Sequence, residues 1–327
     1  MRDYHRASSC VSAIVLMIVM ISPMVHAVDT TKNARQINRM LIVAVDHRNI
    51  RAVKRLLQLG ADPNCRDRYG MRALTVSLYD GVSGIQLLQF PFYSHSHEIA
   101  NVLLTRGADV NGRDTDGRTP LMRMSELGAP NEVASILGKG AKANAVDSSG
   151  SSALHWAAMN YSFVPQENDG LRQKRLTAAC RVIDMLVSHG LNVNDTNKDG
   201  GTPLMYASLL GNSGVVNYLL GLGADVSRNS NSGETALTMA IRAISYGTVF
   251  DLLRAGADPN QATSAVRPPL FWAISMQQPR LVKLLLKFGA DPNRRFATKG
   301  KTVSAVDFAE QLHLGNMVPL LQEPGSR

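Results

Sequence analysis

The chain has 327 residues, of which 45% are hydrophobic and 6% aromatic, and its formal net charge is +9 at pH 7. This composition allows a well-buried core in one long array or in up to three domains, and it excludes a disordered or collagen-like chain. The positive charge is concentrated in residues 32–72, which contain ten Lys and Arg against three Asp and Glu. Such a basic stretch fits either a solvated end of the fold or a surface that attracts an acidic protein or an anionic envelope surface.

The first 27 residues have the pattern of a secretory signal peptide. Arg2 and Arg6 precede an apolar run at 11–21, and Val25-His26-Ala27 places small residues at the −3 and −1 positions of a cleavage site. The apolar run is too short for a comfortable transmembrane helix. We therefore expect cleavage after residue 27, with retention as an anchor as the alternative. The mature chain, 28–327, should then make no stable membrane insertion and should be periplasmic or secreted.

A pentapeptide, GADPN at 60–64, recurs along the rest of the chain. Its seven copies and near-copies open with glycines separated by 47, 33, 50, 33, 33 and 33 residues. Each glycine follows a short apolar segment, and a glycine just past a helix supplies the left-handed residue that ends it. Asp and Asn of the pentapeptide are expected to close a local turn with their side chains. The glycines are Gly60, Gly107, Gly140, Gly190, Gly223, Gly256 and Gly289.

A helix start is predicted about ten residues after each pentapeptide. Thr119-Pro120-Leu121 and Thr202-Pro203-Leu204 combine a Thr N-cap with Pro at the first helical position. The starts at 152–154 and 235–237 are weaker versions, and the start at 268–270 lacks the capping hydroxyl. We count eight helix pairs, whose second helices end near residues 60, 107, 140, 190, 223, 256, 289 and 322. One pair cannot bury its apolar faces alone, whereas stacked pairs can, so the pattern predicts a solenoid.

Segments such as DGGTPLMYASLLGNSGVVNYLLGLGADV resemble the ankyrin repeat, and the resemblance covers roughly residues 35–322. It implies an all-α solenoid of about eight helix–turn–helix units with β-turn or hairpin tips, in a single array over 28–327. The N-terminal unit (35–66) and the C-terminal unit (299–322) should be atypical caps, because each has one face in water. With its N-terminal pattern, the chain is similar to exported bacterial ankyrin proteins.

Two insertions, 82–95 and 160–176, break the 33-residue period between the first and second helices of their pairs. Insertions in repeat proteins map to loops on one face, and long loops in compact arrays are often functional. These two either contact each other or hold a partner, or the first simply covers an open helix end. Their aromatic residues are Phe90, Phe92, Tyr93, Tyr161 and Phe163.

No constellation of catalytic residues is found in the sequence, so we expect no enzyme activity, no cofactor and no metal. His95 and His97 lack a third ligand and suit a surface loop. His155 should form a hydrogen bond between neighbouring repeats, as the ankyrin resemblance implies. Asp147 and Asp199 are explained as turn-capping residues.

Two cysteines remain in the mature chain, Cys65 and Cys180. They lie about three repeats apart, too far for the roughly 7 Å that a disulfide allows between Cα atoms. We expect two unpaired thiols, with Cys180 in the core and Cys65 in an accessible turn.

Ankyrin-like arrays bind partners with their turn tips and with the exposed face of each first helix. Leu209 and Leu210 form a contact patch or pack on neighbouring side chains. Trp156, Tyr206 and Trp272 are assigned to the core between repeats rather than to partner contact. Carried over by position and joined by the insertion aromatics, the candidate partner-binding residues are Arg66, Arg68, Tyr79, Phe90, Phe92, Tyr93, Arg113, Glu126, Leu127, Met159, Tyr161, Phe163, Leu209, Leu210, Arg242 and Met276.

The resemblance implies a non-catalytic protein-binding module, and the N-terminal signal pattern would place it in the periplasm of a Gram-negative bacterium. The interpretation that we favour is an immunity or inhibitor protein that blocks a toxin or effector. Alternatives are an envelope scaffold, a stress-protection factor and a host-directed secreted protein. The expected partner is another protein, for which an acidic surface would suit the positive charge, and not nucleic acid. The free chain should be a monomer.

Overall fold

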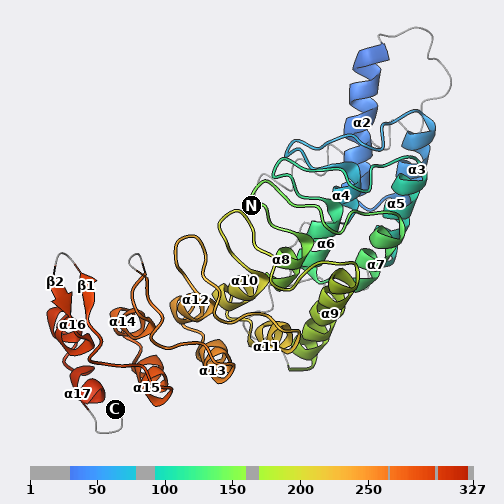
Figure 1. Ribbon diagram of the computed structural model, residues 1–327. Coiled ribbons are helices and arrows are strands. Elements are labelled where there is room, and N and C mark those ends of the chain that lie inside the picture. Colours follow the sequence, from blue (N-terminus) through green and yellow to red (C-terminus); the bar gives the residue numbers. More distant parts are fainter. Residues whose placement is uncertain (1–29, 79–92, 160–168, 264–265, 299–300, 323–327) are drawn as a thin grey trace.

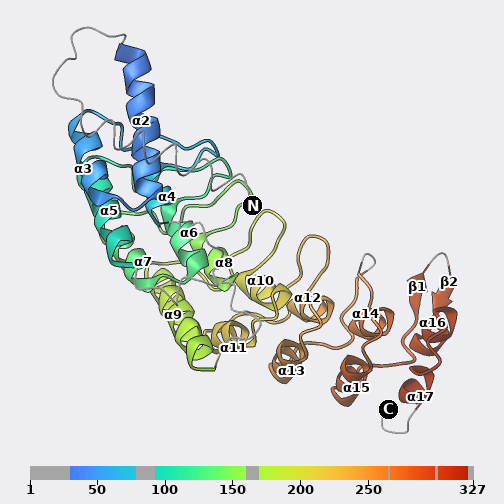
Figure 2. The same ribbon diagram turned by 180° about the vertical axis from the view of Figure 1, so that it is seen from behind.

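The computed structural model describes residues 30–78, 93–159, 169–263, 266–298 and 301–322. Within these residues the chain forms eight consecutive helix pairs that stack into one curved array (Figures 1 and 2). The all-α ankyrin-type solenoid predicted from the sequence is confirmed. None of the described helices has the length and apolar character needed to cross a membrane.

One row of the array consists of the first helix of each pair, called here the inner helices. They are α2 (Thr30–Asp46), α4 (Ala73–Leu78), α6 (Pro120–Leu127), α8 (Ala153–Ala158), α10 (Pro203–Leu209), α12 (Ala236–Arg242), α14 (Pro269–Ser275) and α16 (Ala305–Gln311). The loops that connect one pair to the next project from this row, all on the same side (Figure 1). We call these projecting loops the tips.

The second row consists of the outer helices. They are α3 (Ile50–Gln58), α5 (Tyr93–Thr105), α7 (Pro130–Gly138), α9 (Asp169–Ser188), α11 (Ser213–Gly221), α13 (Tyr246–Arg254), α15 (Pro279–Lys287) and α17 (Val318–Gln322). The last tip contains a small antiparallel hairpin, in which β1 (Phe296–Thr298) pairs with β2 (Lys301–Val303). A single apolar core runs through the stack from Leu41 to Leu321.

The seven pentapeptide glycines end the outer helices as predicted. Their φ angles lie between 87° and 93°. A Cβ atom added to any of them would meet nothing within 4 Å. Space for a side chain is available at these positions. Glycine is therefore required by the left-handed backbone conformation and not by crowding.

The pentapeptide asparagine does not act as the sequence suggested. The Asp closes the local turn, as Asp62 Oδ1 accepts from the Asn64 amide at 2.8 Å. Asn64 instead bridges to the next repeat: its Nδ2 donates to the Gly107 carbonyl at 3.0 Å and its Oδ1 accepts from the Asp109 amide at 2.7 Å. Asn111, Asn194 and Asn260 form the same pair of hydrogen bonds to the repeat that follows them. These asparagines connect neighbouring repeats, and this role could not be inferred from the sequence of one repeat alone.

The predicted inner-helix starts are confirmed where a hydroxyl caps the helix. The Oγ1 atoms of Thr119, Thr202 and Thr235 accept from the amide three residues later, at 3.4, 3.3 and 3.1 Å. Pro268 precedes α14 without a side-chain cap bond. Each cap satisfies a backbone donor that the first turn of a helix leaves free.

The helices extend further than the sequence bounds suggested. The first described helix begins at Thr30, and α5 and α9 begin at Tyr93 and Asp169, so residues 93–95 and 169–176 of the two insertions are helical. As a result α9 has 20 residues, whereas α7 and α11 have nine each. The rest of the insertions, with Phe90, Phe92, Tyr161 and Phe163, lies outside the described residues. So do Tyr79 and residues 1–27, where the sequence predicts a signal peptide.

Candidate partner-binding face

Three consecutive tips are held by the side chain of their first turn residue. Asp114 Oδ1 accepts from the amides of Asp116 and Arg118 at 3.0 and 2.8 Å, and Asp147 Oδ1 accepts from those of Ser149 and Ser151 at 2.8 and 2.9 Å. In the following unit this residue is Asn197, not the Asp199 assigned from the sequence. The caps fix the tip backbone without any help from a partner.

Neighbouring tips also bond to each other. The amides of Ser148, Lys198 and Asn231 donate to the carbonyls of Asp116, Ser149 and Asp199 at 3.1, 3.0 and 2.8 Å. The tips of four successive repeats are therefore a continuous hydrogen-bonded strip along the array. Such a strip is pre-organised for binding, because little entropy remains to be lost on association.

Three inner helices are tied to their tips by a side chain nine residues after the capping residue. Arg123 Nη2 contacts Asp114 Oδ2 at 2.8 Å, and Trp156 Nε1 donates to Asp147 Oδ2 at 3.0 Å. At the equivalent place Asn197 Nδ2 donates to Tyr206 Oη at 2.7 Å. Trp156 is buried, as predicted, whereas Tyr206 and Trp272 are half-buried.

Charges near Trp156 are partly withdrawn from water. Burial alone would raise the pKa of Asp147, but hydrogen bonds from Ser149, the Ser151 amide and Trp156 outweigh it and lower the pKa. The Arg118 Cζ atom lies 3.4 Å from the centre of the Trp156 ring. Burial, and to a smaller extent repulsion from Arg123, lowers the pKa of Arg118. This cluster is a stacked cation–aromatic contact inside the array.

His155 joins two repeats, as predicted. Its Nδ1 accepts from the Ser152 amide at 3.2 Å, which leaves Nε2 to carry the proton and donate to the Gly201 carbonyl at 3.0 Å. Burial lowers the pKa of His155, which is only 1% exposed. The side chain is therefore a neutral structural bridge between two repeats.

Comparisons with known proteins agree with this architecture. The family model for ankyrin repeats (3 copies) matches residues 88–165 and 177–263. Two more ankyrin models match residues 41–90 and 267–296. The chain belongs to the ankyrin repeat family.

The array is similar to three Notch proteins over 108 residues, which are 33% of this chain. Neurogenic locus notch homolog protein 2 of Homo sapiens is 36% identical, and homolog protein 1 is 35% identical in Danio rerio and 34% in Cricetulus griseus. The matched part spans about 4% of the length of these relatives. Ankyrin repeats mediate protein binding, so this ankyrin array is a protein-binding module.

The predicted contact residues at the tips lie on the hydrogen-bonded strip of tips or beside it. Arg66 Nη1 donates to the Gly70 carbonyl at 2.7 Å, and the Arg68 guanidinium lies 4.7 Å from the Tyr69 ring centre. Arg113 Nη1 bridges the carbonyls of Gly117 and Val146 at 2.9 and 2.5 Å. These arginines are exposed, and their hydrogen bonds and ring contact hold them in place.

The predicted residues of the inner-helix face differ in exposure. Leu209 is 41% exposed, whereas Leu127, Met159, Leu210 and Met276 are half-buried. The two charged members are paired, because Glu126 contacts Arg118 and Arg123 at 3.5 Å each and Arg242 pairs with Glu234. Tyr93 is the first residue of α5.

Sequence reasoning missed two exposed apolar residues near Leu209. Ile244, in the turn after α12, is 48% exposed, and Tyr246, the first residue of α13, is 49% exposed. Ser245, between them, donates from Oγ to the Gly211 carbonyl at 3.3 Å, which places this turn against the turn that follows Leu210. Leu209, Leu210, Ile244 and Tyr246 form what we call the apolar edge. The sequence did contain a signal: Ile244 stands at the turn position that is Gly128 after α6 and Gly211 after α10.

The two thiols are unpaired, but their exposures are the reverse of those expected. Cys65 is 7% exposed and its Sγ donates to the Asn38 carbonyl at 3.6 Å. Burial and the nearby Asp62 raise the pKa of Cys65 to about 12, so the thiol is unreactive at neutral pH. Cys180, assigned to the core, is half-buried. The turn that contains Cys65 packs against Asn38 of α2, a contact that the turn position in the sequence did not indicate.

Proposed function

We propose that this ankyrin array is an exported inhibitor that binds one toxin or effector protein and blocks its active surface. The observation that carries the proposal is the rigid tip strip beside an inner face on which Leu209 is 41% exposed. Exposed apolar side chains next to fixed polar groups are the usual composition of a specific protein interface. The export step rests on the N-terminal sequence pattern alone.

The excess of positive charge favours an acidic partner. Arg66, Arg68 and Arg113 are exposed along the tips. Complementary charge increases the rate of association and selects against basic partners. We therefore expect the affinity for the partner to fall as salt concentration rises.

The binding face is tested by pull-down from periplasmic extract with the full chain as bait. Replacing Leu209 and Leu210 by Glu should release the partner, because two charges would enter an apolar contact. The matched control is Leu222→Glu, which alters a 38% exposed leucine after the outer helix α11 and should retain the partner. Equal retention by the double variant and the wild type would exclude the inner face as the binding surface.

A second measurement separates an inhibitor from an envelope scaffold or stress-protection factor. An inhibitor should bind its partner in a one-to-one complex and abolish the toxic activity of that partner. A scaffold should retain several proteins without changing their activity. A toxin gene beside the coding gene would support the inhibitor, whereas a neighbouring catalase or secretion-machinery gene would argue against it.

Export is tested separately. The N-terminus of the protein purified from cells should begin after residue 27, and the protein should be recovered in the periplasmic or secreted fraction. A retained N-terminus in the membrane fraction would indicate an anchor instead. A host-directed protein would be found outside the bacterial cell.

The first insertion offers an independent test of partner contact. Deleting 82–92 leaves α5 intact, because that helix begins at Tyr93. If this segment contacts the partner, the deletion should weaken binding while the array stays folded by circular dichroism. Unchanged binding by the folded deletion variant would assign partner recognition to the tips and inner helices alone.

A further inference from the structure

The outer face of α3, in the first repeat, carries positive charges and no negative ones. Val53, Leu56 and Leu57 of this helix are buried in the core, while Arg51, Lys54 and Arg55 are exposed. No acidic residue lies between His47 and Ala61. Within the described residues no ion pair is formed by these three cations.

Arg55 of α3 is exposed, and among the described residues no helix pair lies before α2 and α3. At the equivalent position, five residues before the pentapeptide glycine, two later repeats have a residue that contacts the preceding repeat. Tyr218 donates from Oη to Asp184, and Asp251 accepts from Asn217, each across one repeat boundary. The equivalent Leu284 is buried. In the first repeat Arg55 holds the equivalent position and is exposed in the described part of the chain.

An open end of a solenoid needs polar residues, but these need not be positively charged. The opposite end shows this, because residues 305–322 contain Asp307 and Glu310 and no Lys or Arg. Solvation of a terminal repeat therefore does not explain why the α3 face is exclusively basic. The charge indicates an anionic ligand.

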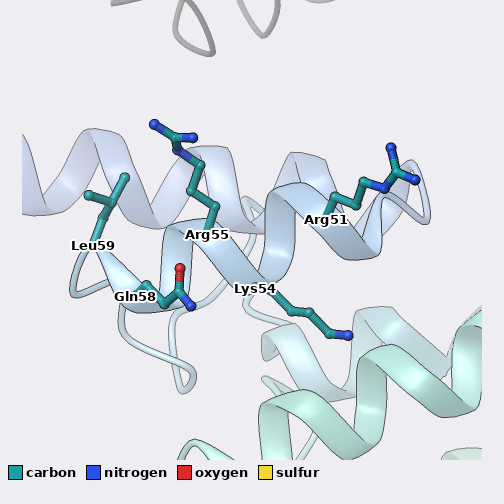
Figure 3. A pocket seen from close by; sticks show the side chains of 5 residues that line it. All are labelled: Arg51, Lys54, Arg55, Gln58 and Leu59. Atoms are coloured by element: carbon teal, nitrogen blue, oxygen red, sulfur yellow. The ribbon is translucent and has the colours of Figure 1, made fainter. Parts of the chain in front are cut away.

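The shape of the face favours a broad ligand over a single bound anion. Figure 3 shows that Arg51 and Arg55 point to the same side of α3 and Lys54 to another, around an open hollow that Gln58 and Leu59 complete. The cationic groups do not converge on one point. At the end of α3, Leu59 is 57% exposed. Cations beside an exposed leucine on an amphipathic helix are the pattern of binding to a membrane surface.

We propose that the outer face of α3 attaches the protein to anionic phospholipid bilayers. Arg51, Lys54 and Arg55 would contact headgroup phosphates, and Leu59 would enter the interface beside them. Each basic residue near an anionic leaflet strengthens binding by about fivefold, and added salt weakens it. This surface lies on the outer helices, so it leaves the inner face free, and the proposal does not depend on an inhibitory function.

The test is sedimentation of the full chain with vesicles of phosphatidylcholine alone or mixed with phosphatidylglycerol. Binding to vesicles of phosphatidylcholine alone measures any contribution of the apolar N-terminal segment. The test variant replaces Arg51, Lys54 and Arg55 by Gln. The matched control replaces Arg280, Lys283 and Lys287 of α15, three exposed cations on another outer helix, and so removes the same charge.

The test variant should lose anionic-vesicle binding by about tenfold or more, and the control by less than about threefold. Leu59→Ser should weaken the same binding by a smaller factor with no charge removed. Equal losses in both triple variants would show unspecific attraction to net charge and overturn the proposal. It is also overturned if the test variant binds vesicles normally but loses binding to poly-L-glutamate, because the face would then serve acidic polypeptides.

Discussion

Trp156 and Trp272 occupy the same position in two repeats, but their surroundings differ. Trp156 is 8% exposed and donates its indole N–H to Asp147 at 3.0 Å. Trp272 is half-buried, and its buried Nε1 has no hydrogen-bond partner in the described part of the chain. The nearest guanidinium carbon lies 3.4 Å from the Trp156 ring, at Arg118, but 5.6 Å from the Trp272 ring, at Arg242.

The residue nine positions earlier accounts for the difference. Asp147 caps its own tip and accepts from Trp156, whereas Thr263 replaces the aspartate in the repeat of Trp272. One carboxylate thus connects tip, inner helix and stacked arginine in the middle of the array. Since stability in a solenoid is a sum of local terms, we expect the C-terminal repeats to open at lower free energy than the middle ones.

The most disruptive change should be Asp147→Ala. It removes the acceptor for Trp156 Nε1 and for the amides of Ser149 and Ser151, and we expect a loss of about 3 kcal/mol in the free energy of unfolding. Urea unfolding followed by circular dichroism measures it. Thr263→Ala, the matched change at Trp272, should cost about 1 kcal/mol or less. Similar losses at the two positions would mean that the aspartate does not stabilise the middle repeats as argued.

The second prediction concerns pH and again distinguishes the middle repeats. Burial lowers the pKa of His155, so between the folded and unfolded pKa values only the unfolded state binds the proton. Stability from the neutral ring is complete above the unfolded pKa, near 6.5, and decreases as pH falls toward the folded value, by at most about 1.4 kcal/mol per pH unit. Thermal unfolding at pH 5 and pH 7 measures this slope, which His155→Gln should reduce. An unchanged slope in that variant would contradict a buried neutral His155.

Features that repeat along the chain could be predicted from the sequence, because seven copies test each interpretation. The left-handed glycines and the Thr caps of α6, α10 and α12 are such features, and both are confirmed. The inter-repeat bond of His155 was predicted from the ankyrin resemblance and is confirmed.

Contacts between repeats could not be predicted from one unit. The two hydrogen bonds of Asn64 to the next repeat join residues that are 43 and 45 positions apart. The burial of Cys65 depends on how its tip folds back on Asn38. The apolar edge was missed because its residues come from two repeats, which the bond from Ser245 to the Gly211 carbonyl brings together.

Restoring the missing carboxylate should bring the C-terminal repeats closer to the middle ones. Thr263→Asp supplies an acceptor nine residues before Trp272, and we expect a gain of about 1 kcal/mol in unfolding free energy. The gain should disappear in a Trp272→Phe background, where no indole N–H remains to be satisfied. A gain that persists in that background would assign the effect to tip capping alone.

The smallest expected effect is also in the C-terminal half, at Ile244. Its φ of 55° is in the left-handed region, where a β-branched residue is strained by about 1 kcal/mol, while its side chain is 48% exposed and gains little from burial. Ile244→Gly should therefore raise the free energy of unfolding by about 0.5 kcal/mol, since the greater freedom of glycine in the unfolded chain offsets part of the relief. Ile244→Asn, which tolerates this backbone and keeps a side chain, should gain at least as much. If both variants also weaken partner retention in the pull-down, the strain at Ile244 is maintained for binding. If either variant is less stable than the wild type, Ile244 contributes more packing than its exposure indicates.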